Sequence, residues 1–478
     1  MPHFDLVVVG TGSGNSIPGR EFDHWNIAIV EQGAFGGTCL NMGCIPTKMY
    51  VYPADLAEGT RRGGELGVHG RVESVDWPAM RDRIFARVDE IEASGRAFRE
   101  GPKWPNTTVY AGTGRFTGRK AMTVWLIDGG TAEITADRFV IAAGGRPVIP
   151  DIPGLDEDDI GQGPVHTSDT IMRIEKLPRR LLIVGGGYIA AEFAHIFASF
   201  GTKVTQVVRG SRLLRHHDTD IATAFAAHAA RRYDLRQDTD VCGVKPETSG
   251  DGGLTVHLEG PYGPDKVETD LMLLATGRVP NSDLLNVRAT GVTVDPRGLV
   301  VVDDHQETVV PGIYALGDIS SHYALKHVAN HEARVVRHNL AHPDDRITSD
   351  HRFVPAAVFT EPQIAAVGLT EQEAQRRGIP YVTGRRDYSG IAAGWAREDT
   401  SGFVKVLADP ETGLLLGAHV IGPEAATVIQ PLIQAMSFGQ RAHDAARGQY
   451  WIHPALTEVV ENALLALPKP KPGQYSRQ

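Results

Sequence analysis

Two cysteines, Cys39 and Cys44, stand five positions apart in a chain of 478 residues whose remaining cysteine is Cys242. A disulfide that closes so short a loop stabilises a fold by only about 2 kcal/mol, because it constrains the unfolded chain little. Chemistry explains the pair better, since a dithiol that opens and closes can exchange electrons with a disulfide substrate. Two other interpretations stay open: two buried thiols that never pair, and a zinc site, which the missing second pair of ligands disfavours.

The residues around the pair favour a reactive thiolate. Pro46 suits the first turn of a helix that continues through Tyr50 to Leu56. Cys44 would lie at the N-terminus of this helix, where free N–H groups and the helix dipole stabilise a thiolate. Lys48 adds a positive charge one turn further along. The stretch therefore predicts a thiolate that donates charge to an electron-poor ring or attacks a disulfide.

A glycine-rich turn between two apolar runs opens the chain. Residues 5–9 predict a strand, the turn Gly10-Thr11-Gly12-Ser13-Gly14-Asn15 follows, and residues 26–31 predict a second strand that ends at Glu31. The pyrophosphate and the ribose of a dinucleotide require a strand, a glycine turn and a terminal acid in this order. The opening of the chain therefore predicts a dinucleotide-binding domain.

Two residues depart from this pattern. The third glycine position of the turn holds Asn15, and Pro18 with Gly19 is expected to cut the following helix short. Close packing of a helix on the first strand is therefore in doubt. The pyrophosphate turn itself is intact.

The same plan occurs a second time, which predicts two dinucleotide sites in one chain. The second copy has a strand-like run at 181–184, the turn Gly185-Gly186-Gly187 and a run at 204–209. Each copy closes with a strand that enters an arginine–proline turn, at 144–147 in the first copy and 277–280 in the second. Two dinucleotides side by side are what a hydride transfer from nicotinamide to flavin needs.

Charge indicates which nicotinamide nucleotide the second copy binds. Its second strand ends with Arg209, where the first copy has Glu31, and Arg215 follows shortly after. A carboxylate would repel a 2′-phosphate, whereas arginine forks bind one. NADPH is therefore predicted over NADH, with His216 and His217 as further members of the anion pocket. The alternative is that both arginines are ordinary surface charges.

Further elements are expected around the two copies. A helical pattern covers residues 77–99, and the run 308–316 predicts a strand that ends at Gly317 and Asp318. A helix through His327 and His331 follows, and neither histidine is given a catalytic role. The remaining predicted elements are strands at 108–111, 122–127, 139–147, 354–360, 402–407 and 414–421 and an amphipathic helix at 424–438.

Composition and charge narrow the class of protein. The formal net charge of -10 at pH 7 argues against a nucleic-acid partner, and no apolar run is long enough to span a membrane. The first residues lead directly into a strand without a signal peptide, so a cytoplasmic protein is expected, in which a lasting disulfide is usually catalytic. A chain of this length is expected to form three or four lobes.

A histidine near the C-terminus supplies the acid that the dithiol lacks. When a thiolate attacks a disulfide, the departing sulfur must be protonated, and histidine is suited to that task. His453 stands before Pro454, and Glu458 follows at a distance that lets its carboxylate hold the imidazole. Taken alone, a histidine before a proline is more often an ordinary loop residue.

The stretch 36–48 resembles the redox-active motif of the flavin-dependent pyridine nucleotide-disulfide oxidoreductases, the family of glutathione reductase, lipoamide dehydrogenase and mercuric reductase. The resemblance continues along almost the whole chain. It implies an α/β fold with two Rossmann-like domains and an α+β dimerisation domain at the C-terminus. The domain boundaries that we expect are FAD-binding 1–150, NADPH-binding 151–275, a central segment 276–345 that completes the FAD domain, dimerisation 346–467 and a flexible tail 468–478.

The resemblance also implies the roles of individual residues. Cys39 attacks the substrate disulfide, Cys44 exchanges electrons with the flavin, Lys48 pairs with Glu192, and Tyr188 gates the nicotinamide site. FAD is held by Gly10, Gly12, Ser13, Gly14, Glu31, Gly37, Thr38, Lys48, Ala143, Gly144, Gly317 and Asp318. NADPH is held by Gly185, Gly187, Tyr188, Ile189, Glu192, Arg209, Arg215 and Gly277. No metal is expected.

His453 and Glu458 match the His-Pro-x-x-x-Glu motif of the family. This resemblance favours an acid–base role for His453 over that of an ordinary loop residue. In the family this dyad reaches across a two-fold axis into the site of the other subunit. The resemblance therefore implies an obligate homodimer with a shared active site, in which His453 protonates the departing thiol.

Three longer blocks, 37–49, 325–334 and 446–456, are similar to the members of the family that reduce mycothiol disulfide, which implies that substrate. Tyr50 and Tyr52 would suit a sugar-inositol conjugate, and equally well could pack in the core. The alternatives are a dihydrolipoamide dehydrogenase that uses NAD, or an enzyme like glutathione or mercuric reductase. An alternative of another class is a flavin electron-transfer or redox-sensing protein without a small disulfide substrate.

Overall fold

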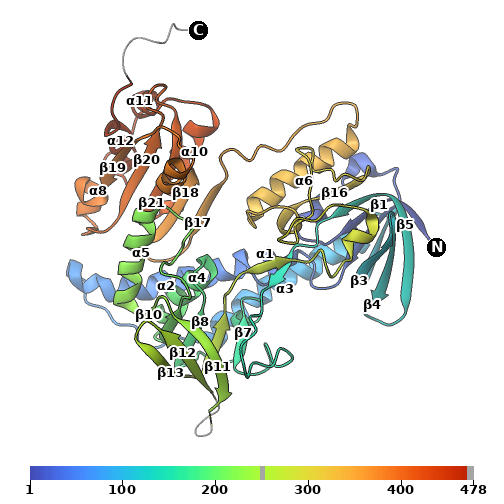
Figure 1. The fold of residues 1–478 in the computed structure, drawn as a ribbon, viewed down its shortest axis with the longest axis horizontal. Helices are drawn as coiled ribbons and strands as arrows, with labels where there is room; N and C mark the ends of the chain where they lie inside the picture. The colour runs from blue at the N-terminus through green and yellow to red at the C-terminus, as the bar shows by residue number, and fades with distance from the viewer. Residues whose placement is uncertain (248–252, 471–478) are drawn as a thin grey trace.

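The computed structural model describes residues 1–247 and 253–470, so most of the predicted tail lies outside the described residues. Three sheet-based lobes are visible in Figure 1. The predicted α/β class, with two dinucleotide-binding folds and an α+β C-terminal part, is confirmed. Within the described residues, no helix has the length and apolar character that crossing a membrane requires.

The first sheet combines parallel strands with a meander. Strand β1 runs parallel to both β2 and β5, and β16 continues the parallel order beyond β5. Strand β4 pairs antiparallel with β3 and β5. The strands are β1 (His3–Val9), β2 (Ile27–Glu31), β3 (Thr107–Gly118), β4 (Ala121–Leu126), β5 (Thr131–Ile141) and β16 (Ile313–Ala315).

No α-helix follows the first glycine turn, whereas Pro18 and Gly19 predict only a shortened one. Only two single 3-10 turns form, Gly14–Ser16 and Arg20–Phe22. Ile17 and Phe22 are buried against the sheet together with helix α6 (Lys326–Ala341), which covers this face in Figure 1. Apolar side chains from a loop and from a distant helix therefore close the core where a Rossmann fold has a helix.

The second sheet is fully parallel, in the order β10-β9-β8-β14-β7, and a three-stranded meander follows its last helix. The parallel strands are β7 (Val165–Thr167), β8 (Arg180–Val184), β9 (Lys203–Val207), β10 (Asp234–Arg236) and β14 (Leu271–Leu274), and the meander is β11 (Asp240–Pro246), β12 (Leu254–Gly260) and β13 (Gly263–Thr269). Helix α4 (Tyr188–Ser199) follows its glycine turn directly, and α5 (Thr219–Arg232) lies beyond β9.

The arginine–proline turns of the two copies pair with each other. Strand β6 (Gly145–Pro147) and strand β15 (Arg278–Pro280) form a short antiparallel ribbon, in which Arg146 lies opposite Val279. The internal repeat thus brings its two equivalent turns to one place, next to the site described below.

The C-terminal lobe is an antiparallel sheet covered by short helices. Its strand order is β17-β18-β21-β20-β19. The strands are β17 (Pro355–Val358), β18 (Gln363–Gly368), β19 (Val382–Asp387), β20 (Phe403–Ala408) and β21 (Leu415–Gly422), and the helices are α7 (Glu371–Arg376), α8 (Ala392–Trp395), α9 (Ala425–Val428), α10 (Gln430–Ser437), α11 (Ala442–Arg447) and α12 (Glu458–Leu465).

One prediction for this lobe is wrong. The single helix expected over 424–438 is divided into α9 and α10 at Ile429. Pro431 stands in the first turn of α10, where a residue without an N–H group begins a helix well but cannot continue one. The apolar periodicity runs through both helices, so the pattern alone concealed the break.

Helices α1 (Gly37–Asn41), α2 (Cys44–Arg62) and α3 (Trp77–Glu100) stand between the two dinucleotide lobes. Helix α2 packs on α4 through a shared core that contains Tyr50, Trp77 and Phe193. Tyr50 is fully buried, stacks on Trp77 at 4.8 Å between ring centroids and donates a hydrogen bond to the Met172 carbonyl. A substrate-binding role for Tyr50 is therefore wrong, whereas Tyr52 is exposed on the outer face of α2.

Candidate active site

The two cysteines lie on consecutive helices. Cys39 belongs to α1, and Cys44 is the first residue of α2, directly after the cap residue Gly43. The buried Asn41 side chain donates hydrogen bonds to the carbonyls of Phe35 and Gly37 and so fixes the turn that precedes the first cysteine. The predicted position of Cys44 at a helix N-terminus is confirmed.

Both cysteines are free thiols, and their side chains are hydrogen-bonded to each other. The hydrogen bond from Cys39 and the positive charge of Lys48 lower the pKa of Cys44 to about 6. The same hydrogen bond, together with burial, raises the pKa of Cys39. At neutral pH the reduced pair therefore holds one proton, on Cys39, and one negative charge, on Cys44.

The predicted ion pair between Lys48 and Glu192 is present. The Lys48 ammonium lies 2.7 Å from Oε2 of Glu192, whose side chain is only 4% exposed. Glu192 Oε1 also accepts a hydrogen bond from the Phe359 backbone N–H, and the Lys48 ammonium lies 4.7 Å from the centre of the Phe359 ring. One carboxylate thus ties together the cysteine helix, helix α4 and the start of the C-terminal lobe.

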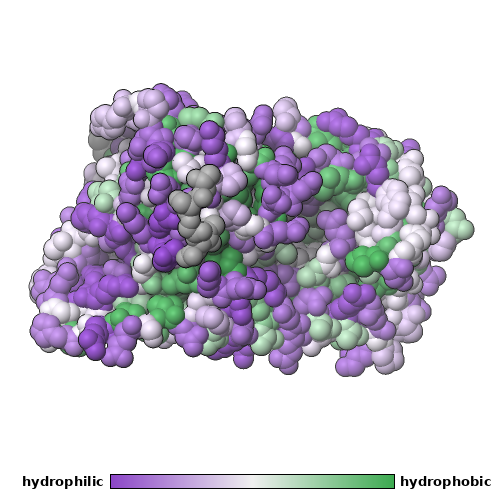
Figure 2. All heavy atoms as spheres, turned by 90° about the horizontal axis from the view of Figure 1, so that it is seen from below, coloured by the Kyte–Doolittle hydropathy of each residue, from purple (hydrophilic) through white to green (hydrophobic). Residues whose placement is uncertain are grey.

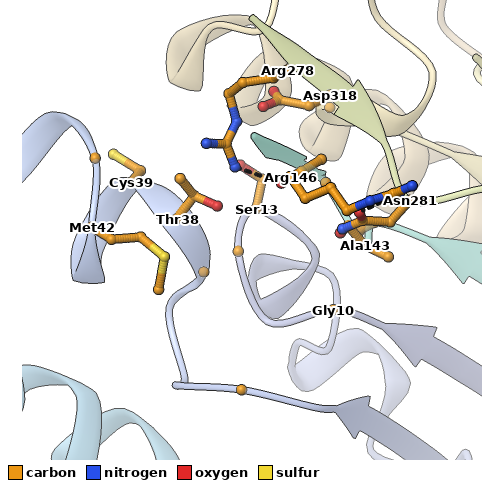
Figure 3. Close-up of a pocket in the computed structure, with 18 of the residues that line it drawn as sticks. Gly10, Ser13, Thr38, Cys39, Met42, Ala143, Arg146, Arg278, Asn281 and Asp318 are labelled. Atoms are coloured by element: carbon orange, nitrogen blue, oxygen red, sulfur yellow. Dashed lines mark hydrogen bonds between the residues drawn. The ribbon is translucent and has the colours of Figure 1, made fainter. Parts of the chain in front are cut away.

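A cavity of about 390 Å³ runs from the first glycine turn to the cysteines. In Figure 3, Thr38, Cys39 and Met42 face Arg278 and Asp318 across it, with the turn at Gly10 and Ser13 between them. The predicted FAD and catalytic residues that line it are Gly10, Gly12, Ser13, Glu31, Gly37, Thr38, Cys39, Cys44, Lys48, Ala143, Gly144, Tyr188, Ile189, Glu192, Gly317 and Asp318. Gly14 lies behind the turn and is buried against the sheet.

The backbone of the cavity fits a dinucleotide. A Cβ atom at Gly37 would lie 2.7 Å from the Cα of Gly12, and one at Gly10 would lie 2.4 Å from the Ala142 carbonyl oxygen. Only glycine allows these turns to come so close, which leaves room for a pyrophosphate along their N–H groups. Glu31 accepts hydrogen bonds from the N–H and hydroxyl of Thr11, so its carboxylate is held at the end of β2 where a ribose would lie. The residues present therefore fit FAD.

The polar lining residues that were missing from the predicted site include four with long or amide side chains: Arg146, Arg278, Asn281 and Lys326. Arg278 pairs with Asp169 at 3.0 Å, and Arg146 forms a two-pronged ion pair with Asp283. Three of the four stand in or beside the arginine–proline turns, so the repeat itself was the signal for them. Lys326 carried no such signal, because its position depends on how α6 docks.

The residues predicted for the nicotinamide nucleotide fall into two groups. Tyr188, Ile189 and Glu192 lie at the start of α4 and line the cavity, and Tyr188 is 42% exposed. Gly185, with φ of +141°, and Gly187 form the second glycine turn in front of that helix, and the Gly277 carbonyl accepts a hydrogen bond from Val148. The other group, Arg209 and Arg215, is exposed on the loop after β9 and does not line the cavity.

The histidines next to Arg215 differ from each other. His216 accepts a hydrogen bond from the Arg215 guanidinium at 3.2 Å. His217 is turned inward, where burial and the neighbouring His419 lower its pKa to about 4, so that its ring is neutral at pH 7. The ring of His217 therefore adds no positive charge at pH 7, and its place in the anion pocket stays a prediction.

The predicted acid–base pair is formed but stands apart from the cysteines. His453 Nδ1 lies 2.8 Å from Glu458 Oε1, and Glu458 begins α12. The His453 side chain is 71% exposed, and neither residue lines the cavity within this single chain. Tyr450 and Ile452, two exposed apolar residues, stand beside it. In the described part of the chain, no group of three or more acidic, histidine or cysteine residues has a geometry that could hold a metal ion.

Comparison with known proteins places these features in context. A model of pyridine nucleotide-disulphide oxidoreductases matches residues 4–333, and a model of the dimerisation domain of these proteins matches residues 354–464. The mycothione reductase of Mycobacterium tuberculosis is 49% identical over 98% of this chain and 100% of its own length.

More distant relatives are a dihydrolipoyl dehydrogenase of Haloferax volcanii, 33% identical over 96% of each chain, and a mercuric reductase of Streptomyces lividans, 33% identical over 95% of this chain and 94% of its own. Among solved structures, the HOCl-induced flavoprotein disulfide reductase RclA of Escherichia coli has a TM-score of 0.82 at 27% identity and covers 96% of this chain and 99% of its own.

Proposed function

This chain belongs to the pyridine nucleotide-disulphide oxidoreductase family, and from that membership we propose that it reduces mycothiol disulfide with electrons from NADPH. The family implies an enzyme that uses FAD and a nicotinamide nucleotide. The observation that carries the proposal is the hydrogen-bonded pair of Cys39 and Cys44 at the start of α2, beside the Lys48 ammonium and inside the cavity. The 49% identity to a mycothione reductase supports the substrate.

The residues that would hold FAD are the glycine turns and Glu31, Lys48, Arg278 and Asp318 around the cavity. When bound, the flavin accepts a hydride from the nicotinamide and passes two electrons to the cysteine disulfide. Lys48 lies beside the cysteines and keeps a positive charge near them, held in place by Glu192.

The chemistry on the substrate needs both cysteines. Cys39, as thiolate, attacks one sulfur of the substrate disulfide, forms a mixed disulfide with it and releases the other half as a thiol. Cys44 then attacks Cys39, closes the intramolecular disulfide and releases the second thiol. Two electrons enter and two substrate thiols leave in each turnover. The proton held on Cys39 must leave before the attack, and a histidine suits that transfer.

The acid–base group would come from a second copy of the chain. His453 and Glu458 do not line the cavity of their own chain, and the exposed residues Tyr450 and Ile452 beside them suit a subunit interface. In a homodimer, His453 of the partner subunit would take the proton from Cys39 and deliver it to the departing thiol. The matched dimerisation domain supports this arrangement.

The preference for NADPH would come from the loop after β9. Arg209 and Arg215 are exposed there, with guanidinium groups that suit a 2′-phosphate. A Tyr188 side chain that is partly exposed at the start of α4 suits a gate over the nicotinamide site. Replacement of both arginines by alanine should raise the KM for NADPH and leave that for NADH nearly unchanged.

The substrate is tested by turnover of the purified flavoenzyme with three disulfides. With NADPH in excess, kcat/KM for mycothiol disulfide should exceed that for glutathione disulfide and lipoamide by about a hundred-fold or more, since a site built for a polar substrate rejects molecules that leave its groups unpaired. If lipoamide were turned over fastest, the proposed substrate would be wrong, and the chain would be a dihydrolipoamide dehydrogenase.

A further inference from the structure

The first dinucleotide site lacks the positive charge that its fold normally supplies. In Rossmann folds, the N-terminus of the helix after the glycine turn points at the pyrophosphate and carries about half a positive charge. Here the chain after Gly12 forms two short 3-10 turns, Gly14–Ser16 and Arg20–Phe22, and no α-helix up to β2. The second site, by contrast, has the 12-residue helix α4 at this place. Another group must therefore balance the anion in the first site.

One face of α6 occupies the missing helix's place. Lys326, Asn330, Ala333 and Arg337 are spaced by three or four residues, so they share one face of this helix. Ser13 Oγ donates a hydrogen bond to Asn330 Oδ1 at 3.0 Å, and Arg337 forms an ion pair with Glu21 on the irregular segment. Helix α6 thus holds the turn and the loop after it in position.

Arg99, on helix α3, also holds the segment after the first glycine turn in position. Its guanidinium donates to Oδ1 of Asn15 at 2.8 Å and to the carbonyls of Asn15 and Pro18. The side chain is 5% exposed, and within the described residues it has no carboxylate partner. The two departures from the glycine motif, Asn15 and Pro18, therefore provide the acceptors for this arginine.

Of the two positively charged residues on this face of α6, Lys326 and Arg337, Lys326 lines the cavity. Its ammonium donates a hydrogen bond to Ser13 Oγ at 3.0 Å and lines the cavity together with Cys39 and Asp318. Lys326 forms no ion pair in the described part of the chain. Burial raises the pKa of Asp318, and the hydrogen bond with Cys44 together with burial raises the pKa of Cys39; the positive charge of Lys326 partly offsets both shifts, so it acts across the cavity.

We propose that Lys326 binds the pyrophosphate of FAD beside Ser13 and replaces the absent helix N-terminus as its main source of positive charge. A lysine ammonium is a point charge that suits a phosphate oxygen without a fixed approach direction. Asn330 and Arg99 are positioning residues, because they hold Ser13 and the turn where Lys326 meets them. The inference rests on the proposed function only for the presence of FAD in this cavity.

The test measures flavin binding rather than turnover. Apoprotein of the full chain is titrated with FAD at low and at high salt, and binding is followed by the quenching of flavin fluorescence. Lys326→Met should weaken FAD binding about ten- to a hundred-fold at low salt, the effect expected for losing a hydrogen bond to a charged group. Its affinity should also fall less steeply with salt than that of the wild type, because one screened contact is gone.

Two controls separate a charge effect from a structural one. Lys326→Arg keeps the charge and should retain most of the affinity, and Lys176→Met removes an exposed lysine elsewhere and should change nothing. Riboflavin has no phosphate, so its weak binding should be the same in the wild type and in Lys326→Met. Equal loss of riboflavin and FAD affinity would show a general defect of the site and overturn the inference.

FAD binding by Lys326→Met with wild-type affinity and wild-type salt dependence would also overturn it. A wild-type apoprotein that binds no flavin at all would instead overturn the proposed function. The two failures are thus distinguishable in the same titration.

Discussion

The ammonium of Lys48 lies 2.7 Å from the carboxylate of Glu192, and this contact joins the helix that begins with Cys44 to the helix that follows the second glycine turn. Glu192 is almost fully buried and also accepts the Phe359 N–H. The pair therefore fixes the distance between the dithiol and the second dinucleotide lobe, and it keeps a positive charge close to Cys44.

Lys48→Met should raise the pKa of Cys44, because the lysine charge favours the thiolate. The rate of alkylation of the reduced protein by iodoacetamide, measured against pH, gives this pKa directly. The wild type should show a midpoint near 6, and the variant a midpoint clearly above it. Lys48→Arg keeps the charge and serves as the control. An unchanged midpoint in Lys48→Met would show that the charge of Lys48 does not lower the pKa of Cys44.

Cys39 should matter for the same pKa through its hydrogen bond, which has the largest effect on Cys44. Cys39→Ala removes the donor and should move the alkylation midpoint upward, whereas Cys39→Ser keeps a hydroxyl donor and should move it less. If both variants titrate alike, the thiol hydrogen bond does not stabilise the thiolate.

The reduced protein should gain stability as the pH rises from about 6 toward 9. The pKa of Cys44 is depressed in the folded state, from 9.0 to about 6, so its contribution is present above the unfolded pKa and is lost as the pH falls through the folded one. The raised pKa of Cys39 acts in the opposite direction only at higher pH, where an unfolded thiol ionises. The measurement is the unfolding free energy of the reduced wild type minus that of Cys44→Ser across this range. A flat difference would contradict the depressed pKa.

His453→Gln should lower kcat for disulfide reduction by about 10²- to 10⁴-fold, the usual contribution of a positioned acid–base group. Reduction of the cysteine pair by NADPH should remain nearly as fast, because this half-reaction releases no substrate thiol that His453 must protonate. Mixed dimers of His453→Gln and Cys39→Ser subunits provide the sharper control. One of their two sites carries both intact groups if the site is shared, so activity should reappear on mixing. No recovery in verified mixed dimers would contradict a shared site.

Lys405→Met should destabilise the fold by about 3–5 kcal/mol, because it leaves the buried carboxylate of Asp218 without its cation. The Lys405 ammonium lies 3.0 Å from Asp218, 2.7 Å from Asp220 and 2.5 Å from Glu371, and it joins the C-terminal sheet to the start of α5. Denaturant unfolding measures the loss. An exposed lysine such as Lys176 is the matched control, and an equally small effect of both replacements would show that the cluster contributes little.

Much of the fold was readable from local patterns, because the elements near the site are set by short-range signals. The glycine turns, the strands around them and the helix start at Cys44 depend on neighbouring residues. Pro18 predicted a shortened helix, and the structure has only 3-10 turns there. The surface in Figure 2 is mostly hydrophilic with apolar groups between the polar ones, as a globular chain of this composition requires.

Some features could not be predicted from the sequence, because they depend on how segments far apart in the chain pack together. Lys326 reaches Ser13, 313 residues earlier in the chain, only because α6 covers the first turn. Tyr50 and Tyr52 share one helix, and only the packing on Trp77 decides that the first is buried and the second exposed. His216 and His217 are adjacent in the sequence, and only the packing of the C-terminal lobe, which places His419 beside His217, distinguishes the two rings.

Anaerobic titration of the purified flavoenzyme with NADPH tests most directly whether the cysteine pair is coupled to the flavin. After one equivalent, the wild type should show two new thiols by alkylation and mass spectrometry, together with a long-wavelength absorbance band from the Cys44 thiolate next to the oxidised flavin. Cys44→Ser should lack both the band and the new thiols. Flavin reduction in the wild type with no band and no new thiols on Cys39 and Cys44 would contradict the account.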